Sequence, residues 1–251
     1  MSNKTSKNSI VLTLIIIFAF LFRILTINCG LVESSQLQNF YYDEFAIASR
    51  PVEMVLNNDL NPYWFIESTW YKYAIFIPLY LTKFFTSINL VNAIVIGRLI
   101  SILFALLTII LVYYIGKEIY DERLGLIASL FMSINPNYFY YSTLVKEDSM
   151  VVFFITFAIY YFIKYIKYEK IYLFYISMFI GGLATSTKYP AGLTIIPFTI
   201  FFIFKNYKNL NLTYHIKTIF ISAFAFIFGF VLLTPYSILS FKEFSDGALW
   251  E

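Results

Sequence analysis

Long runs of apolar residues with almost no charge inside them occur along the whole chain, and they constrain its fold more than any other feature. The hydrocarbon core of a bilayer is about 30 Å thick, and an α-helix needs roughly 20 apolar residues to cross it. Charged residues make up only 13% of the sequence, whereas a soluble domain has about 25%. The sequence therefore predicts an all-α integral membrane protein.

Seven apolar stretches are predicted to cross the membrane. They are Ile10–Cys29, Ile96–Gly116, Leu124–Tyr141, Ser149–Ile166, Ile171–Thr187, Ala191–Phe204 and Thr218–Leu239. Arg23, near the end of the first stretch, is expected to extend toward the interface. An eighth stretch, Tyr73–Thr82, contains Pro78 and is too short to span comfortably, so we interpret it as interfacial or re-entrant and keep eight spans as the alternative.

The distribution of positive charge favours seven spans. With seven, the loops on the side of the N-terminus carry ten basic residues, which makes that side cytoplasmic. Both acidic pairs then lie on the outer face: Asp43–Glu44 in a long loop over residues 30–95, and Glu147–Asp148 in the loop 142–148. An eighth span would place the two pairs on opposite faces.

Other features exclude several classes of function. A net charge of +3 is too small to indicate nucleic-acid binding. One cysteine, Cys29, and one histidine, His215, cannot form a disulfide or a typical zinc site, so any metal would need oxygen ligands. No predicted span has an acid in its interior, which disfavours an ion-coupled transporter.

The acidic pairs also have an ordinary interpretation. An acidic dipeptide in a loop often only increases solubility. The segment DEFAIASRPVEMVLNND is predicted to form a short amphipathic helix along the membrane, interrupted near Pro51. Asp43 stands at the start of this helix, where capping alone could explain it.

Several motifs point to a known family by their order and spacing. They are YYDEFAIAS, DLNPYWF, YKYAIFIPLYL, GRLISILFALL, YSTLVKEDSMVVFF and GLATSTKYPAGL. Together they resemble the protein O-mannosyltransferase and aminoarabinose-transferase-like branch of the GT-C membrane glycosyltransferases, over nearly the whole chain. The resemblance implies a GT-C-like helical bundle whose long first loop carries juxtamembrane helices.

The resemblance also implies an activity. It implies an inverting transferase that moves a sugar from a polyprenyl-phosphate donor to a protein, lipid or glycan acceptor on the extracytoplasmic face of the plasma membrane. Asp43 matches the catalytic base or acceptor-positioning carboxylate, and Glu44 is the second member of that pair. Asp148 matches an acid that helps to form a metal or acceptor site in some relatives, with Glu147 adjacent.

In the same family, cations near the membrane contact the donor phosphate. The candidates here are Lys72, Arg98 and Lys188. A divalent cation is left open as a further aid to the leaving phosphate.

We expect residues 1–251 to form a single membrane module that lacks the C-terminal part of longer relatives. Two other functions remain as alternatives, a lipid or sugar-lipid transporter and a non-catalytic membrane scaffold.

Overall fold

The structure is a computed structural model that describes residues 2–31, 42–67, 69–207 and 212–248. All regular secondary structure in these ranges is helical. Residues 32–41 of the long first loop lie outside the described residues.

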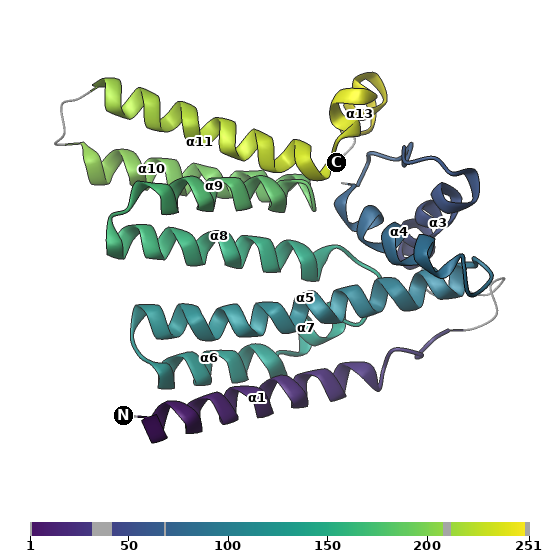
Figure 1. Ribbon diagram of the computed structural model, residues 1–251, viewed down its shortest axis with the longest axis horizontal. Coiled ribbons are helices and arrows are strands. Elements are labelled where there is room, and N and C mark those ends of the chain that lie inside the picture. Colours follow the sequence, from purple (N-terminus) through teal and green to yellow (C-terminus); the bar gives the residue numbers. More distant parts are fainter. Residues whose placement is uncertain (1, 32–41, 68, 208–211, 249–251) are drawn as a thin grey trace.

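The helices of the main bundle lie side by side along their lengths (Figure 1). They are α1 (Ser2–Ile24), α5 (Leu90–Ile119), α6 (Glu122–Ile134), α8 (Asp148–Tyr168), α9 (Ile171–Thr185), α10 (Ile195–Asn206) and α11 (Leu212–Leu233). Helix α1 packs on α6 and α5, α5 packs on α8, α8 on α9, and α9 on α11.

Three further helices, α3, α4 and α13, lie at the right-hand end of the bundle in Figure 1. The elements outside the main bundle are α3 (Tyr42–Asn57), α4 (Trp70–Thr82), α7 (Pro136–Tyr141), the 3-10 helix η1 (Tyr189–Thr194), α12 (Tyr236–Leu239) and α13 (Phe241–Ala248). The stretch Tyr73–Thr82 forms most of α4, which stays at this end with α3.

Within the described residues, four helices are long and apolar enough to cross a membrane: residues 7–24 of α1, together with α5, α8 and α11. Helix α9 is also apolar but has only 15 residues. The predicted class, an all-helical membrane protein, is therefore supported. Because α6 and α10 have 13 and 12 residues, seven spans stay a prediction.

Three predicted spans are not single α-helices, and one of them, Ala191–Phe204, starts in the 3-10 helix η1 and continues as α10. The stretch Leu124–Tyr141 is not one helix, because α6 ends at Ile134 and α7 restarts at Pro136. Proline has no N–H to continue the ladder, and the side chain of Asn135 caps the new helix by accepting the N–H of Tyr138 at 2.9 Å. In the last predicted span, Thr218–Leu239, helix α11 ends at Leu233 and α12 starts at Tyr236. Pro235 lies between them and has no N–H to continue the helix.

The predicted interruption near Pro51 is wrong. Helix α3 continues through Pro51 to Asn57. Ile47 and Val55, on either side of the proline, are both buried in the core, so packing on both sides maintains the helix.

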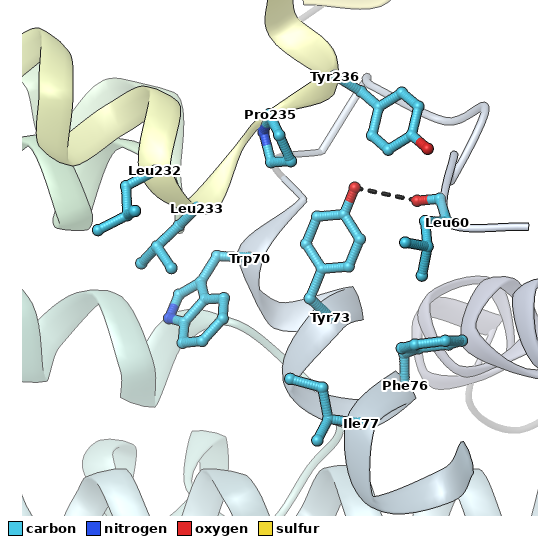
Figure 2. A pocket seen from close by; sticks show the side chains of 9 residues that line it. All are labelled: Leu60, Trp70, Tyr73, Phe76, Ile77, Leu232, Leu233, Pro235 and Tyr236. Carbon is cyan, nitrogen blue, oxygen red and sulfur yellow. Dashed lines mark hydrogen bonds between the residues drawn. The ribbon is translucent and has the colours of Figure 1, made fainter. Parts of the chain in front are cut away.

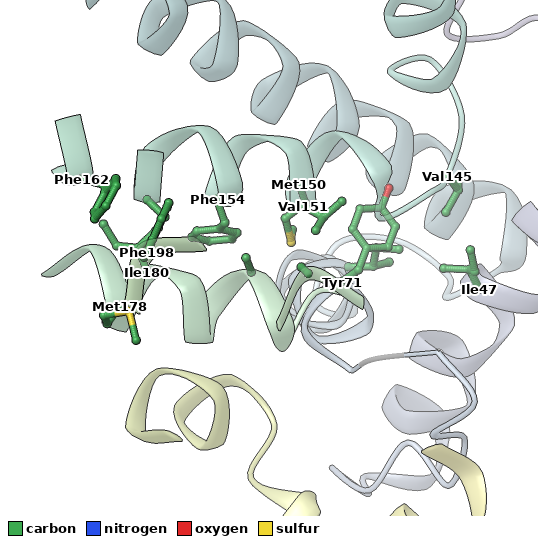
Figure 3. Close-up of a cluster of buried hydrophobic side chains, with 14 of the residues drawn as sticks. Ile47, Tyr71, Val145, Met150, Val151, Phe154, Phe162, Met178, Ile180 and Phe198 are labelled. Atoms are coloured by element: carbon green, nitrogen blue, oxygen red, sulfur yellow. The ribbon is translucent and has the colours of Figure 1, made fainter. Parts of the chain in front are cut away.

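The main core lies between α8, α9 and α10 and continues to the helices at the end of the bundle (Figure 3). Phe162 of α8 stacks on Phe198 of α10 at 4.1 Å between ring centroids. At the other end of the cluster, Ile47, Tyr71 and Val145 are buried. The segments that carry the acidic pairs, the start of α3 and the turn before α8, are therefore joined to one core.

Close helix contacts depend on glycine at two places. A Cβ atom at Gly182 of α9 would collide with the backbone carbonyl of Phe226 in α11. A Cβ atom at Gly116 of α5 would collide with the backbone of Gly125 in α6. Small residues permit such close approach of membrane helices.

We expect Gly182→Ala to destabilise the protein by about 1–3 kcal/mol, because the backbone of α11 must move to admit the methyl group. The neighbouring variant Gly181→Ala is the matched control, since a Cβ there meets only ordinary contacts at 3.7 Å or more. Denaturant unfolding in detergent micelles measures both. Equal stability of the two variants would contradict the proposed α9–α11 contact.

Candidate functional site

The two acidic pairs of the sequence come together at one end of the bundle, where the start of α3 meets the turn before α8. Lys146 joins them: its Nζ lies 2.6 Å from Oδ2 of Asp43. The next two residues, Glu147 and Asp148, both face Lys188, whose Nζ lies 3.4 Å from the Glu147 carboxylate and 3.0 Å from that of Asp148. The site is thus a cluster of three carboxylates and two lysines from three separate segments.

These side chains differ in their exposure to solvent. The side chain of Asp43 is 59% exposed, that of Asp148 31% and that of Glu147 13%. Asp43 is therefore the carboxylate of this cluster that a second molecule reaches most easily.

Both lysines of the cluster are held in the charged form. The hydrogen bond to Asp43 is the main reason that the pKa of Lys146 is raised. Partial burial lowers the pKa of Lys188, but the charges of Glu147 and Asp148 outweigh it, so the net direction is upward. Both ammonium groups stay positive throughout the neutral pH range.

Beneath this cluster lies a buried ion pair. Arg98 and Glu44 have side chains that are 1% and 2% exposed. Arg98 donates from Nε and Nη2 to the two carboxylate oxygens of Glu44, at 3.0 and 2.7 Å, which is the bidentate geometry that arginine favours. Its Nη1 donates to the carbonyls of Ile27 and Cys29. Arg98 therefore joins the end of α1 to α3 and faces no solvent.

The buried pair also fixes the turn that carries Lys146. The N–H of Val145 donates to Oε1 of Glu44 at 2.7 Å. Ser101 of α5 donates to the carbonyls of Leu144 and Lys146, at 2.7 and 3.2 Å. The backbone just before Glu147 is thus hydrogen-bonded on two sides, which orients the charged side chains.

Lys72, the remaining predicted cation, lies elsewhere. Its side chain is 1% exposed, and its Nζ donates to the carbonyls of Trp64 and Glu67, at 3.2 and 2.9 Å. These contacts hold the loop before α4.

An apolar cavity of about 280 Å³ lies beside the site, between α4 and the junction of α11 and α12 (Figure 2). Trp70 and Tyr73 line it from α4, and Leu233 and Pro235 line it from the other side. The backbone N–H of Trp70 donates to the backbone carbonyl of Ser186, which is two residues before Lys188. The charged cluster therefore has an apolar surface next to it.

The described residues contain no group of three histidine, cysteine or acidic side chains arranged to hold a metal ion. Asp43, Glu147 and Asp148 are each paired with a lysine. The side chains as placed do not fit a divalent cation, and we derive no step through one.

Lys146 and Ser101 were not among the residues that the sequence analysis singled out for the site. The sequence could have predicted Lys146 as a site residue, because it directly precedes the acidic pair Glu147–Asp148 at the start of a predicted span. Ser101 could not, since a serine inside an apolar helix has no pattern that shows which carbonyl it binds.

Comparison with known protein families gives one match. A family model described as dolichyl-phosphate-mannose-protein mannosyltransferase matches residues 75–234, more than half of the chain. The match includes Arg98, Glu147, Asp148 and Lys188, and it begins after Asp43. A search of curated proteins finds no match.

Proposed function

Because the chain belongs to the dolichyl-phosphate-mannose-protein mannosyltransferase family, we propose that it transfers a sugar from a polyprenyl-phosphate donor to an acceptor hydroxyl with inversion. The acceptor is a protein, lipid or glycan, and the reaction takes place on the extracytoplasmic face of the plasma membrane. Membership of the family supports membrane glycosyltransferase activity in general.

One observation carries the proposal: the exposed carboxylate of Asp43 lies in the same cluster as Glu147, Asp148 and two lysines. A hydroxyl is a poor nucleophile, and a carboxylate within hydrogen-bond reach makes it reactive by taking its proton. The leaving phosphate gains negative charge, which nearby cations stabilise. The cluster supplies both kinds of group.

We assign the steps as follows. Asp43 accepts the proton of the acceptor hydroxyl while that oxygen attacks the anomeric carbon of the donor sugar. The bond between the anomeric carbon and the phosphate oxygen breaks, and the polyprenyl phosphate leaves with both bonding electrons. Attack opposite the leaving group inverts the anomeric centre.

The structure changes how we divide the predicted cations. Lys188 is partly exposed and stays a candidate for the donor phosphate, with Lys146 added to it. Arg98 and Lys72 are buried and already bonded, so we propose that they position the loops. Glu44 likewise positions the turn at Val145 and does not take part in proton transfer.

The direct test is a transfer assay. Membranes that contain the chain are incubated with radiolabelled polyprenyl-phosphate mannose, and label in protein, lipid and glycan fractions is compared with membranes that lack it. We expect chain-dependent transfer to one fraction. No transfer from mannose or from any other polyprenyl-phosphate hexose would contradict the proposal and favour a transporter or a scaffold.

A separate prediction concerns which side of the membrane each loop of the chain occupies. Cys29 is free and exposed, so it is first replaced in a Cys29→Ser background. Single cysteines at positions 43, 148 and 167 are then treated in intact cells with a membrane-impermeant maleimide. We expect labelling at 43 and 148 but not at 167. Labelling at 43 and 167 but not at 148 would mean that residues 73–82 cross the membrane.

Lys188 gives a prediction about donor binding. We expect Lys188→Met to raise the KM for the donor at least about tenfold, because a hydrogen bond to a charged group is worth roughly 1.5–3 kcal/mol. The raised pKa of Lys188 keeps it protonated, so in the wild type this contribution is constant from pH 6 to 9. Lys83→Met, which removes a lysine bonded to Asn58, is the control. An unchanged donor KM in Lys188→Met would exclude Lys188 from the phosphate site.

A further inference from the structure

A buried cation at the end of α1 has no counter-charge among the residues that the structure describes. Arg23 was expected to extend toward the interface, but this prediction is wrong, since its side chain is 0% exposed. It turns inward because polar partners lie there. Its Nε donates to Oγ of Ser142 at 2.8 Å, and its Nη1 donates to the carbonyl of Ala19 at 3.1 Å.

The other buried cations are compensated, which makes Arg23 unusual. Arg98 has Glu44 at 2.7 Å, and Lys72 has Glu67 at 3.9 Å. In the described part of the chain, no carboxylate pairs with Arg23, and its Nη2 has no hydrogen-bond partner. A buried charge without a counter-ion is costly, so an anion at Nη2 would stabilise this region.

An apolar groove of about 360 Å³ lies beside Arg23, between α1 and the α6–α7 junction. It is lined by Phe18, Phe22, Ser133, Ile134, Pro136 and Phe139. Two of these residues also contact Arg23: Ser133 accepts from Nη1 through its carbonyl at 3.5 Å, and the Phe139 ring lies 5.4 Å from the guanidinium carbon.

The outer rim of the groove is apolar and open. Phe18, Phe22 and Ile134 are 43%, 55% and 52% exposed. Helix α1 is one of the helices apolar enough to cross a membrane, so these side chains face lipid chains in the bilayer. Arg23 lies in the last turn of α1, which places it at one end of this apolar helix.

We propose that this groove binds an anionic phospholipid of the surrounding bilayer, with one acyl chain along Phe18 and Ile134 and the phosphate paired with Nη2 of Arg23. A basic side chain above an apolar channel is complementary to a phosphate above a hydrocarbon chain. The rings of Phe22 and Phe139, which meet edge to face at 6.2 Å, must separate to admit the headgroup.

The position of the groove distinguishes it from the transfer site. The groove lies on the side of α1 and α6, whereas Lys188 follows α9; α5 and α8 stand between them (Figure 1). Arg23 nevertheless holds Ser142, the first residue of the turn that leads to Lys146. A phospholipid bound to Arg23 would therefore hold this turn in place through the hydrogen bond between Arg23 and Ser142.

The test measures lipid binding by native mass spectrometry of the full chain. The protein is delipidated and titrated with dioleoylphosphatidylglycerol or dioleoylphosphatidylcholine. We expect wild type to bind phosphatidylglycerol at least tenfold more tightly than phosphatidylcholine. Arg23→Gln should lose this preference, and Arg50→Gln, which removes a partly exposed arginine of α3, should retain it.

A second variant is needed because Arg23→Gln could unfold. Ile134→Trp fills the exposed groove while it keeps Arg23, and we expect it to weaken phosphatidylglycerol binding at least tenfold at unchanged thermal stability. Full binding in Ile134→Trp, or no preference for phosphatidylglycerol in wild type, would overturn the proposal. Undecaprenyl phosphate is the competitor: if it binds wild type more tightly than phosphatidylglycerol does and displaces it, the groove belongs to the donor and the proposal fails.

Discussion

Replacing Asp43 with asparagine is expected to lower kcat for sugar transfer by about 10²–10⁴-fold, the usual contribution of a positioned general base. Asparagine has the same size but cannot accept the proton of the acceptor hydroxyl. Donor KM should change little, because the phosphate contacts come from other residues. Initial rates at saturating donor and acceptor measure the effect.

Stability separates loss of chemistry from loss of fold in this variant. The side chain of Asp43 is 59% exposed, and its partner Lys146 lies at the surface. An exposed ion pair contributes about 0–1 kcal/mol, so Asp43→Asn should unfold at nearly the same denaturant concentration as wild type. Glu53→Gln is the matched control, because it removes an exposed carboxylate from the same helix, where Glu53 pairs with Arg50.

The opposite outcome has a definite meaning. If Asp43→Asn keeps full activity while wild type transfers sugar, family membership still accounts for the reaction, but Asp43 only caps α3 or increases solubility. Glu147 or Asp148 would then be the carboxylate to test next.

The main features that the sequence predicted depend on properties that act over many residues. Apolar runs of the required length predicted a helical membrane protein. Charge counting placed Asp43 and Asp148 on one face, and the structure brings their segments together through Lys146 and Lys188. The first argument holds because burying charge in lipid is costly wherever it occurs, whereas the membrane face of the two acids stays a prediction.

What the sequence did not predict depends on individual contacts. Arg98 was predicted to contact the donor phosphate, and only the fold shows that it pairs with Glu44, 54 residues away. The break in the third span was different, since the Asn135–Pro136 dipeptide carries a recognisable capping and proline signal. The sequence analysis did not use that signal, because the dipeptide lies inside a long apolar run that was interpreted as one span.

The pair formed by Glu44 and Arg98 gives the second large expected effect. We expect Arg98→Leu or Glu44→Leu to destabilise the protein by about 3–5 kcal/mol, because each leaves the other charge buried without a partner. The double variant should lose less than the sum of the two, since it removes both charges at once. Denaturant unfolding in detergent micelles measures the coupling, and additive losses would mean that the two side chains act independently.

The rate of sugar transfer then shows whether the pair also positions the site. Glu44 accepts the N–H of Val145, directly before Lys146, so Glu44→Leu should release the turn that orients Lys146 and Glu147. Gly116→Ala is a suitable control, because it disturbs the α5–α6 contact without touching this turn. At a temperature where both variants stay folded, we expect Glu44→Leu to lose at least about tenfold more kcat than Gly116→Ala, which corresponds to roughly 1.4 kcal/mol of transition-state stabilisation. Equal rates in the two variants would restrict Glu44 to holding the fold together, because a purely structural pair would lower the amount of folded protein and leave the rate of each folded molecule unchanged.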